Sequence, residues 1–368
     1  MSDSANVPDL NNQTWVDDGG LFMWCFENPK SDICDDVSSH YQYRLDLAPN
    51  AAFLAIFGAS LIGFVVVWII TRKGTAFNIA LILGLVCEVL GYAGRILSWQ
   101  NPWSENGFLV QICCLTIGPA FMAAGIYLCL RRIVSAFGPE NSRLPPEYYT
   151  RIVSLPIQIN SVKQLTQCPV QFIPCDVISL ILQALGGALA SVSSHQHEDP
   201  KTGSNIMIAG LAFQVATILG FILCSLDFAL RTMRRQRALG DAALDQRPQV
   251  VKVRNSRRFK AFLGALSLAS FCILWRSAFR VAELSEGWDG PVMGDQYMFV
   301  GFEGILIIVA VVALNIFHPA LCMKELLELD DGALKGLWCL RSRKNKAINS
   351  ESVSESEGKT RTARGVAI

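Results

Sequence analysis

Seven long apolar stretches constrain this chain more than any other feature of its sequence. A helix needs roughly 20 mostly apolar residues to cross the hydrocarbon core of a bilayer, and backbone polar groups inside lipid must be satisfied internally. The sequence therefore predicts an all-α, polytopic membrane protein, a bundle of seven transmembrane helices. The predicted spans are residues 51–70, 77–97, 108–130, 172–191, 206–230, 261–282 and 297–317.

The composition agrees with a membrane protein and narrows its partners. Hydrophobic residues make up 51% of the chain and charged residues 17%, whereas about a quarter of the residues of soluble domains are charged. The net charge of +1 gives no overall basic field of the kind that nucleic-acid binding uses. We expect membrane lipids as partners and no nucleic acid, and the sequence does not identify a protein partner.

Lys and Arg residues are distributed unevenly between the two sides of the predicted bundle. With the amino terminus outside, the cytoplasmic segments carry 26 of them, the spans carry three, and the outer segments carry only Lys30, Arg44 and Lys201. Cytoplasmic loops are enriched in Lys and Arg. We therefore expect an outer amino-terminal tail (residues 1–46), a membrane domain (47–318) and a cytoplasmic carboxyl-terminal tail (319–368).

The amino-terminal tail has three further features. Its only apolar run, residues 21–26, is too short for a signal peptide, so the first span is expected to insert by itself. Asn12 begins an Asn-Gln-Thr glycosylation sequon. Cys25 and Cys34 lie in the same tail and are candidates for a disulfide in an oxidising space. A disulfide and two free thiols both fit the sequence.

Several kinds of chemistry are absent from the sequence. No GxxxxGK[ST] motif occurs, so we expect no ATP binding through a P-loop. Zinc hydrolases need clustered ligands, but the four His residues are spread over the outer tail, one outer loop and the inner end of the last span. No span contains the lysine that retinal chemistry requires. We expect no enzymatic activity, no cofactor and no metal.

Ionisable residues inside the predicted spans are the candidates for a substrate-binding site, because charges in lipid are costly unless they are paired or face a polar cavity. In the second span, Glu88 and Arg95 are seven residues apart and lie within about 20° of the same helix face, with Tyr92 between them. The sixth span adds Arg276 and Arg280 and is followed by Glu283, and the seventh span adds Glu303.

Two interpretations of these charges stay open and are compatible. In the first, they form ion pairs that hold the second, sixth and seventh spans together. In the second, they line a polar vestibule open to the outside, in which arginines hold a phosphate or carboxylate and Glu88 or Glu303 holds an ammonium group. An amphiphile with an apolar tail and a charged head would fit such a lining.

Other polar residues and glycines are assigned structural roles. Asp176 opens the fourth span and Asp227 closes the fifth, near Arg131 and Arg132, and we interpret this inner-face set as salt bridges. Further expectations concern three short groups. They are a hydrogen bond between spans at Gln183 and Gln214, close helix packing at Gly186-Gly187, and a kink at Gly118-Pro119.

Four motifs, in order, resemble the fungal RTA-like family of lipid-translocating exporters. The resemblance covers about residues 43–325, nearly the whole bundle. The motifs are Glu-Val-Leu-Gly-Tyr-Ala-Gly-Arg at 88–95, the Gly-Pro segment at 118–127 with Leu-Arg-Arg-Ile at 130–133, Cys-Asp-Val-Ile-Ser-Leu at 175–180 with 183–187, and Phe-His-Pro at 317–319.

The resemblance implies a protein that exports or flips an amphipathic lipid toward the outer leaflet and gives resistance to toxic, membrane-active compounds. The implied partners are sphingoid bases, phospholipids or sterol-like amphiphiles. The resemblance brings no established binding residue, although its motifs contain Glu88, Arg95 and Asp176. Without a KDEL-type signal or prenylation box, the plasma membrane is the expected location, with the vacuole and endoplasmic reticulum as alternatives.

A function from another class also fits seven spans with an outer amino terminus. A receptor or sensor that detects a lipid or a stress compound and signals inward would have the same topology. Arg131 and Arg132 follow the third span, as an arginine motif does in some receptors, but no acidic residue precedes them. The topology alone does not separate the two classes.

Residues 153–171 interrupt the family pattern. The family runs almost directly from the Pro-Pro-x-Tyr-Tyr segment at 145–149 to the Cys-Asp motif at 175–176. We hypothesise that the 19 extra residues are a retained intron, because Val153-Ser154 can be encoded by a splice donor and Gln171 by the acceptor CAG. A genuine loop insertion is the alternative. Transcript reads that join Ile152 directly to Phe172 would confirm an intron, and uninterrupted coding sequence without splice signals would contradict it.

Overall fold

The computed structural model describes residues 20–137 and 172–323, apart from gaps at 32, 35–36, 38, 40, 42, 196–198, 200, 241–245, 288–289 and 291–293. The sequon at Asn12, the insertion at 153–171 and the tail after residue 323 lie outside these residues. The hypotheses about them therefore stay predictions.

The described chain is helical, and seven of its helices are long and apolar enough to cross a membrane. This confirms the predicted all-α bundle of seven spans. The spans are α3 (Leu47–Thr71), α4 (Thr75–Gln100), α5 (Glu105–Phe137), α6 (Phe172–His195), α7 (Lys201–Leu239), α9 (Arg257–Ser285), and a seventh assembled from α10 (Gln296–Met298), η6 (Phe299–Ile305), α11 (Leu306–Ile316) and α12 (Pro319–Cys322). The helices extend beyond the predicted apolar stretches, most clearly in α7, which continues for nine residues past residue 230.

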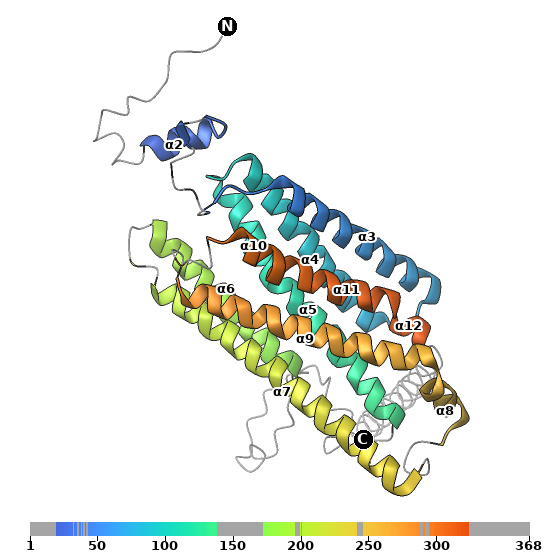
Figure 1. Cartoon of the computed structure of the whole chain (residues 1–368). Coiled ribbons are helices and arrows are strands. Elements are labelled where there is room, and N and C mark those ends of the chain that lie inside the picture. Colours follow the sequence, from blue (N-terminus) through green and yellow to red (C-terminus); the bar gives the residue numbers. More distant parts are fainter. Residues whose placement is uncertain are drawn as a thin grey trace, which may run out of the picture.

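The spans run side by side along one common direction (Figure 1). Helix α4 packs between α3 and α5, α6 pairs with α7, and α11 contacts both α3 and α9. The short helix α2 (Gly20–Glu27) lies beyond the end of the bundle where α3 begins, and α8 (Pro248–Asn255) lies at the opposite end. We refer to these as the α2 end and the α8 end.

The surface of this bundle is apolar, as is most of its interior. Large apolar side chains cover the outside; Ile70, for example, is 76% exposed, and Leu185 is 56% exposed. The interior combines aromatic and aliphatic packing with buried Arg and Glu side chains. An apolar exterior of this kind is suited to contact with lipid tails.

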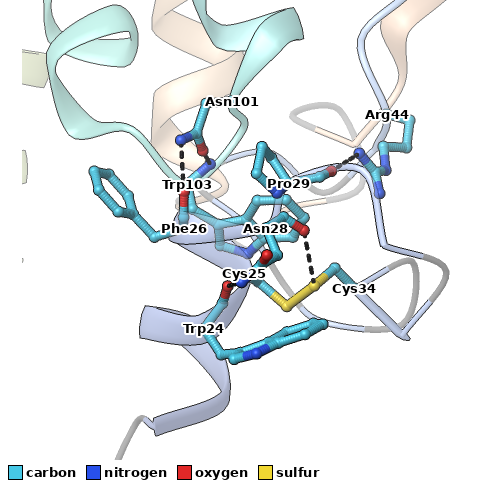
Figure 2. The surroundings of a disulfide bond; sticks show 9 residues. All are labelled: Trp24, Cys25, Phe26, Asn28, Pro29, Cys34, Arg44, Asn101 and Trp103. Atoms are coloured by element: carbon cyan, nitrogen blue, oxygen red, sulfur yellow. Dashed lines mark hydrogen bonds between the residues drawn. A yellow bond between two sulfur atoms is a disulfide. The ribbon is translucent and has the colours of Figure 1, made fainter. Parts of the chain in front are cut away.

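The amino-terminal segment forms a small cross-linked unit at the α2 end (Figure 2). Cys25 and Cys34 form a disulfide with Cα atoms 5.7 Å apart. Both sulfurs are buried against Trp103, which lies in the turn between α4 and α5. The Asn101 side chain in that turn donates a hydrogen bond to the carbonyl of Phe26 at 2.9 Å. The segment is thereby attached to the end of the bundle.

Helices α6 and α7 approach each other so closely that glycine is required at the contact. A Cβ atom on Gly186 would lie 2.4 Å from the backbone nitrogen of Met207, and one on Gly203 would lie 2.3 Å from that of Ala190. Gly187 has only the Met207 sulfur nearby, at 3.8 Å. The predicted close packing therefore depends on Gly186, with Gly203 as its partner across the interface.

We expect Gly186→Ala to destabilise the protein by about 1–3 kcal/mol, because backbone atoms on the facing helix would have to move apart. Thermal unfolding of the purified protein in detergent measures this as a lower midpoint. Gly187→Ala is the matched control, expected to keep the wild-type midpoint. Equal midpoints for the two variants would contradict the described contact.

Candidate functional site

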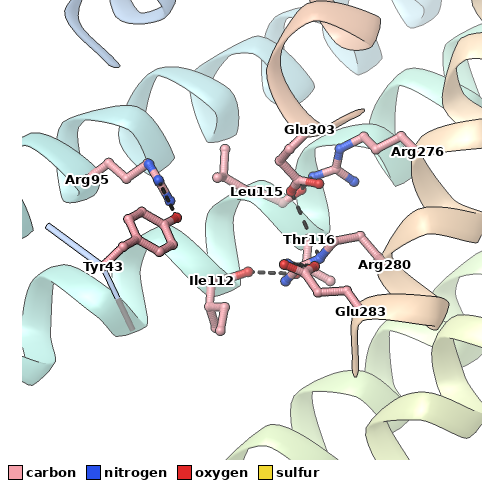
Figure 3. A network of polar contacts seen from close by, with 9 residues as sticks. All are labelled: Tyr43, Arg95, Ile112, Leu115, Thr116, Arg276, Arg280, Glu283 and Glu303. Atoms are coloured by element: carbon pink, nitrogen blue, oxygen red, sulfur yellow. Dashed lines mark hydrogen bonds and ion pairs between the residues drawn. The ribbon is translucent and has the colours of Figure 1, made fainter. Parts of the chain in front are cut away.

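Arg276 on α9 links three helices in the middle of the bundle. Its guanidinium donates one hydrogen bond to Glu303 Oε1 in η6, at 2.5 Å, and another to the carbonyl of Leu115 on α5 (Figure 3). Pro119 lies four residues after Leu115 and has no N–H to donate to that carbonyl. The proline therefore leaves an acceptor inside the bundle, and Arg276 satisfies it.

Arg280 lies one turn further along α9 and extends the same network. Its Nη1 contacts Glu283 Oε2 at 2.5 Å, and its Nε lies 4.0 Å from Glu303 Oε1. All these side chains are buried. We call Glu88, Arg276, Arg280, Glu283 and Glu303 the central polar cluster. When all five are ionised, it carries three negative charges and two positive charges.

Glu88 is the member of this cluster that accounts for the excess negative charge. Its side chain is fully buried, and neither carboxylate oxygen has a hydrogen-bond partner among the described residues. Arg276 and Glu303 are its charged neighbours, beyond hydrogen-bond distance. A Cβ atom on Gly118 would lie 2.9 Å from Glu88 Oε1, so the glycine makes room for the carboxylate.

The helix of the seventh span changes type at this site. Residues Phe299–Ile305 form a π-helix that contains Glu303. Such segments re-aim side chains and frequently occur at functional sites. Gly304 lets this segment contact α3, since a Cβ atom there would lie 2.3 Å from the Phe53 ring. The π-helix thus presents Glu303 to Arg276 while its other face packs against α3.

Arg95 is buried but belongs to a different set of contacts, nearer the α2 end. Its Nε donates to Asn50 Oδ1 at 2.8 Å, and its Nη2 donates to the hydroxyl of Tyr43 at 2.9 Å. The guanidinium also lies 3.8 Å from the centroid of the Phe299 ring, a cation–π contact. Figure 3 shows the Arg95–Tyr43 pair apart from the Arg276 network.

The amino-terminal segment also enters the bundle at Tyr41. The Tyr41 hydroxyl donates to Gln111 Oε1 on α5 at 2.5 Å. Burial raises the pKa of Tyr41 to about 12, while the neighbouring Ser98 hydroxyl and the charge of Arg95 oppose the shift. The phenol therefore remains a donor at physiological pH. Tyr41 and Tyr43 together close the α2 end of the bundle over Arg95.

The structure separates the second-span residues that the sequence grouped. Glu88, Tyr92 and Arg95 are all buried on α4. Ion pairs connect the sixth and seventh spans, but none involves Glu88 or Arg95 within the described part of the chain. The Tyr92 ring packs on Phe53 and Phe57, and its hydroxyl has no partner among the described residues.

The predicted inner-face set is not one salt-bridge network among the described side chains. Asp176 is buried on α6 and accepts a hydrogen bond from Thr217 Oγ1 on α7 at 2.7 Å. Asp227 instead pairs with Arg231 at 2.9 Å near the surface. Thr217 and Asp227 are ten residues apart on α7, about 15 Å along the helix, so the two carboxylates lie at different depths.

The remaining residues of that set can be placed only in part. Both Arg131 and Arg132 lie on α5, but the side chain of Arg131 is outside the described part.

The expected bond between spans at Gln183 and Gln214 is present, with Gln183 Nε2 2.9 Å from Gln214 Oε1. Within the described residues, no group of three or more His, Cys, Asp or Glu side chains is arranged to hold a metal ion.

The comparisons with known proteins identify the family. The sequence pattern of the family described as RTA1 like protein matches residues 81–326 of this chain. The chain belongs to the RTA1-like family. The resemblance found in the sequence motifs is therefore confirmed, and the match contains the whole central polar cluster. No solved structure matches the chain.

Three proteins of Saccharomyces cerevisiae are among the similar sequences. The Sphingoid long-chain base transporter RSB1 of strain Lalvin EC1118 / Prise de mousse is 30% identical over 268 residues, which cover 67% of this chain and 65% of that protein. Protoporphyrin uptake protein 1 is 29% identical, covering 63% of this chain and 65% of its own length. Protein RTA1 is 25% identical, with coverages of 76% and 86%. The chain thus spans slightly less than two thirds of the first two.

We expect Arg276→Gln to destabilise the bundle by about 3–5 kcal/mol, because it leaves Glu303 as an uncompensated buried charge. The double variant Arg276→Gln with Glu303→Gln should be less destabilised than Arg276→Gln alone. Free energies of unfolding in detergent, arranged as a double-mutant cycle, measure both effects. Arg231→Gln is the surface control and should cost less than about 1 kcal/mol. Additive single-variant effects at 276 and 303 would contradict the ion pair.

Proposed function

We propose that this protein translocates an amphipathic lipid with a cationic head group, of the sphingoid-base type, across the membrane. The observation that carries the proposal is the buried, unpartnered carboxylate of Glu88 in a family that includes a sphingoid long-chain base transporter. In this proposal the protein is an exporter and not an enzyme. It gives resistance to membrane-active compounds by moving such lipids.

The central polar cluster has the chemistry that an amino-alcohol head group requires. An ammonium group donates three hydrogen bonds and carries one positive charge, which would balance the excess negative charge at Glu88. Besides Glu88, the cluster has an acceptor in Glu303 Oε2 and a donor in Arg276 Nε that find no hydrogen-bond partner among the described residues. The hydroxyls of a sphingoid base both donate and accept, so they suit this mixture.

The energetics favour a charged head in this position. An uncompensated carboxylate in a low-dielectric interior costs several kcal/mol. A cation that neutralises Glu88 recovers part of that cost, and a proton does the same when the ligand leaves. The apolar outer surface of the helices keeps the lipid tail in the bilayer while the head exchanges partners.

The proposed orientation has the amino terminus outside, most suitably at the plasma membrane. The uneven distribution of Lys and Arg, 26 on one side and three on the other, supports this orientation. The Cys25–Cys34 disulfide supports it too, because disulfides form and persist in oxidising compartments. This orientation predicts a glycan on Asn12, detected as a loss of mass after glycosidase treatment. An unglycosylated Asn12 in a tail that a membrane-impermeant reagent does not reach from outside would contradict the orientation.

The transport proposal is tested with purified protein in liposomes that contain a fluorescent sphingoid base, by following its exchange between leaflets. Wild-type protein is expected to accelerate exchange. Glu88→Gln should reduce the rate about tenfold or more, because a charge-assisted bond to the head group is lost. Glu286→Gln, an exposed carboxylate at the end of α9, is the matched control and should keep the wild-type rate.

Two results would contradict the proposal. One is the absence of protein-dependent exchange for a sphingoid base, a phospholipid and a sterol-like amphiphile, from protein shown to be folded by its unfolding transition. The sensor class would then become the better explanation. The other is a wild-type rate in Glu88→Gln, which would mean that the head group does not use this carboxylate.

A further inference from the structure

A second buried carboxylate lies between α6 and α7, away from the central polar cluster. Asp176 is only 3% exposed. Its Oδ1 accepts the hydrogen bond from Thr217, whereas its Oδ2 is buried without a hydrogen-bond partner among the described residues. No described Lys or Arg side chain forms a salt bridge with it. A carboxylate in this condition needs a cation or a proton.

The side chains that act on the Asp176 carboxylate carry hydroxyl groups. The hydroxyl of Tyr127 on α5 is close enough to interact electrostatically with the carboxylate and has no hydrogen-bond partner of its own within the described part of the chain. Thr217 Oγ1 also contacts the carbonyl of Gln214, whose side chain accepts from Gln183. Gln183 Oε1 likewise has no partner in the described ranges. The unpartnered atoms of this set are thus all oxygens, in contrast to the central polar cluster.

This arrangement selects a particular class of ligand. Hard metal ions take six or more oxygen ligands, and one carboxylate with neutral oxygens offers too little charge for a divalent ion. A primary ammonium group carries one charge and three donors, which matches one free carboxylate oxygen with the hydroxyls of Thr217 and Tyr127 beside it. The anionic head of a phospholipid would meet a negative charge here.

The surroundings of Asp176 suit a ligand with a long apolar tail. The next residues of α6, Val177, Ile178 and Ile181, are each at least 50% exposed on the outer face of the bundle. A tail beside them would remain in lipid while its head reached the carboxylate. Aromatic rings close the inner side, because Tyr127 packs on Phe172 and Phe221 with centroids 5.5 and 4.4 Å away.

Asp176 and Glu88 lie at different depths. Asp176 is the fifth residue of α6, about 6 Å along the axis from its first residue, and Glu88 is the fourteenth of α4, about 20 Å from its start. On α5, Glu88 lies beside Gly118, whereas Asp176 lies near Tyr127, nine residues further from the α2 end. Asp176 is therefore nearer the α8 end than Glu88.

We propose that Asp176, with Thr217 and Tyr127, forms a second binding site for the ammonium head of a long-chain amine, nearer the α8 end than Glu88. The site itself is argued from its geometry, and the choice of a lipid amine as ligand rests on the proposed function. A head group then has two anionic sites at successive depths of the membrane.

The test is photoaffinity labelling of the full-length protein in lipid nanodiscs. The probe is a long-chain primary amine with a diazirine two carbons from the nitrogen, and the comparison probe is the alcohol of the same chain and diazirine position. Mass spectrometry locates the labelled peptides. The amine is expected to label the segment 172–183 roughly tenfold more than the alcohol does, because only the amine pairs with a carboxylate.

Variants assign the labelling to the carboxylate. Asp176→Asn keeps the size of the side chain and an acceptor for Thr217 but removes the charge, so amine labelling of 172–183 should fall to the level of the alcohol. Labelling of α4 around Glu88 should persist. Asp227→Asn removes an exposed carboxylate on α7 and is the matched control, expected to label as wild type.

Defined results would overturn the proposal. Equal labelling of 172–183 by amine and alcohol in wild-type protein would do so, even if Asp176→Asn failed to fold. Unchanged amine labelling in a folded Asp176→Asn would do so as well. Failure of the proposed function is distinguishable, because leaflet exchange can be absent while the amine still labels Asp176, and exchange can be present while it does not.

Discussion

The bundle depends on the three-way contact of Arg276 with Glu303 and with the Leu115 carbonyl. A proline in a helix leaves the carbonyl four residues earlier without its N–H donor, and in water a solvent molecule donates the missing hydrogen bond. Inside a membrane no such donor exists, so another helix must provide it. The guanidinium of Arg276 has several donors in a fixed fork. It can therefore satisfy the carbonyl freed by Pro119 and pair with Glu303 at the same time.

This contact explains why charges lie in the interior at all. Removing water from Arg276 and Glu303 is costly, and their attraction offsets that cost only with good geometry. The contact provides the geometry by joining α5, α9 and the π-helix of the seventh span. Once these helices are fixed, Glu88 on α4 faces a cluster in which Arg276 pairs with Glu303 and Arg280 pairs with Glu283. Its carboxylate is left without a hydrogen-bond partner among the described residues.

Features that follow from local sequence could be predicted, and features that depend on contacts between distant segments could not. Seven spans were predictable because the hydrophobic requirement of a bilayer acts on every residue of a span. The shared face of Glu88 and Arg95 followed from helical spacing. The partner of Arg95 did not, since Asn50 and Tyr43 belong to another helix and to an irregular segment. A missed signal was available at Pro119, whose position implies a free carbonyl at Leu115.

Asp176 shows the limit of judging depth from sequence. It stands near the start of an apolar stretch, which suggested pairing at the water boundary. The neighbouring α7 continues beyond that level, and Phe172 packs beneath Tyr127, so the carboxylate is enclosed. Burial of this kind comes from the relative lengths of two helices and from side chains on a third, which no local pattern encodes.

The cross-linked unit at the α2 end has a practical consequence. The Cys25–Cys34 bond fixes the segment that leads to Tyr41 and Tyr43, and Tyr43 is a direct partner of the Arg95 guanidinium. Thiol reductants are routine additives during purification, and the cytosol of bacterial hosts keeps thiols reduced. Protein produced under either condition would lack the cross-link in the segment that leads to Tyr43. Oxidising preparation is therefore part of the definition of the native sample, and reductant becomes a variable to control in any functional assay.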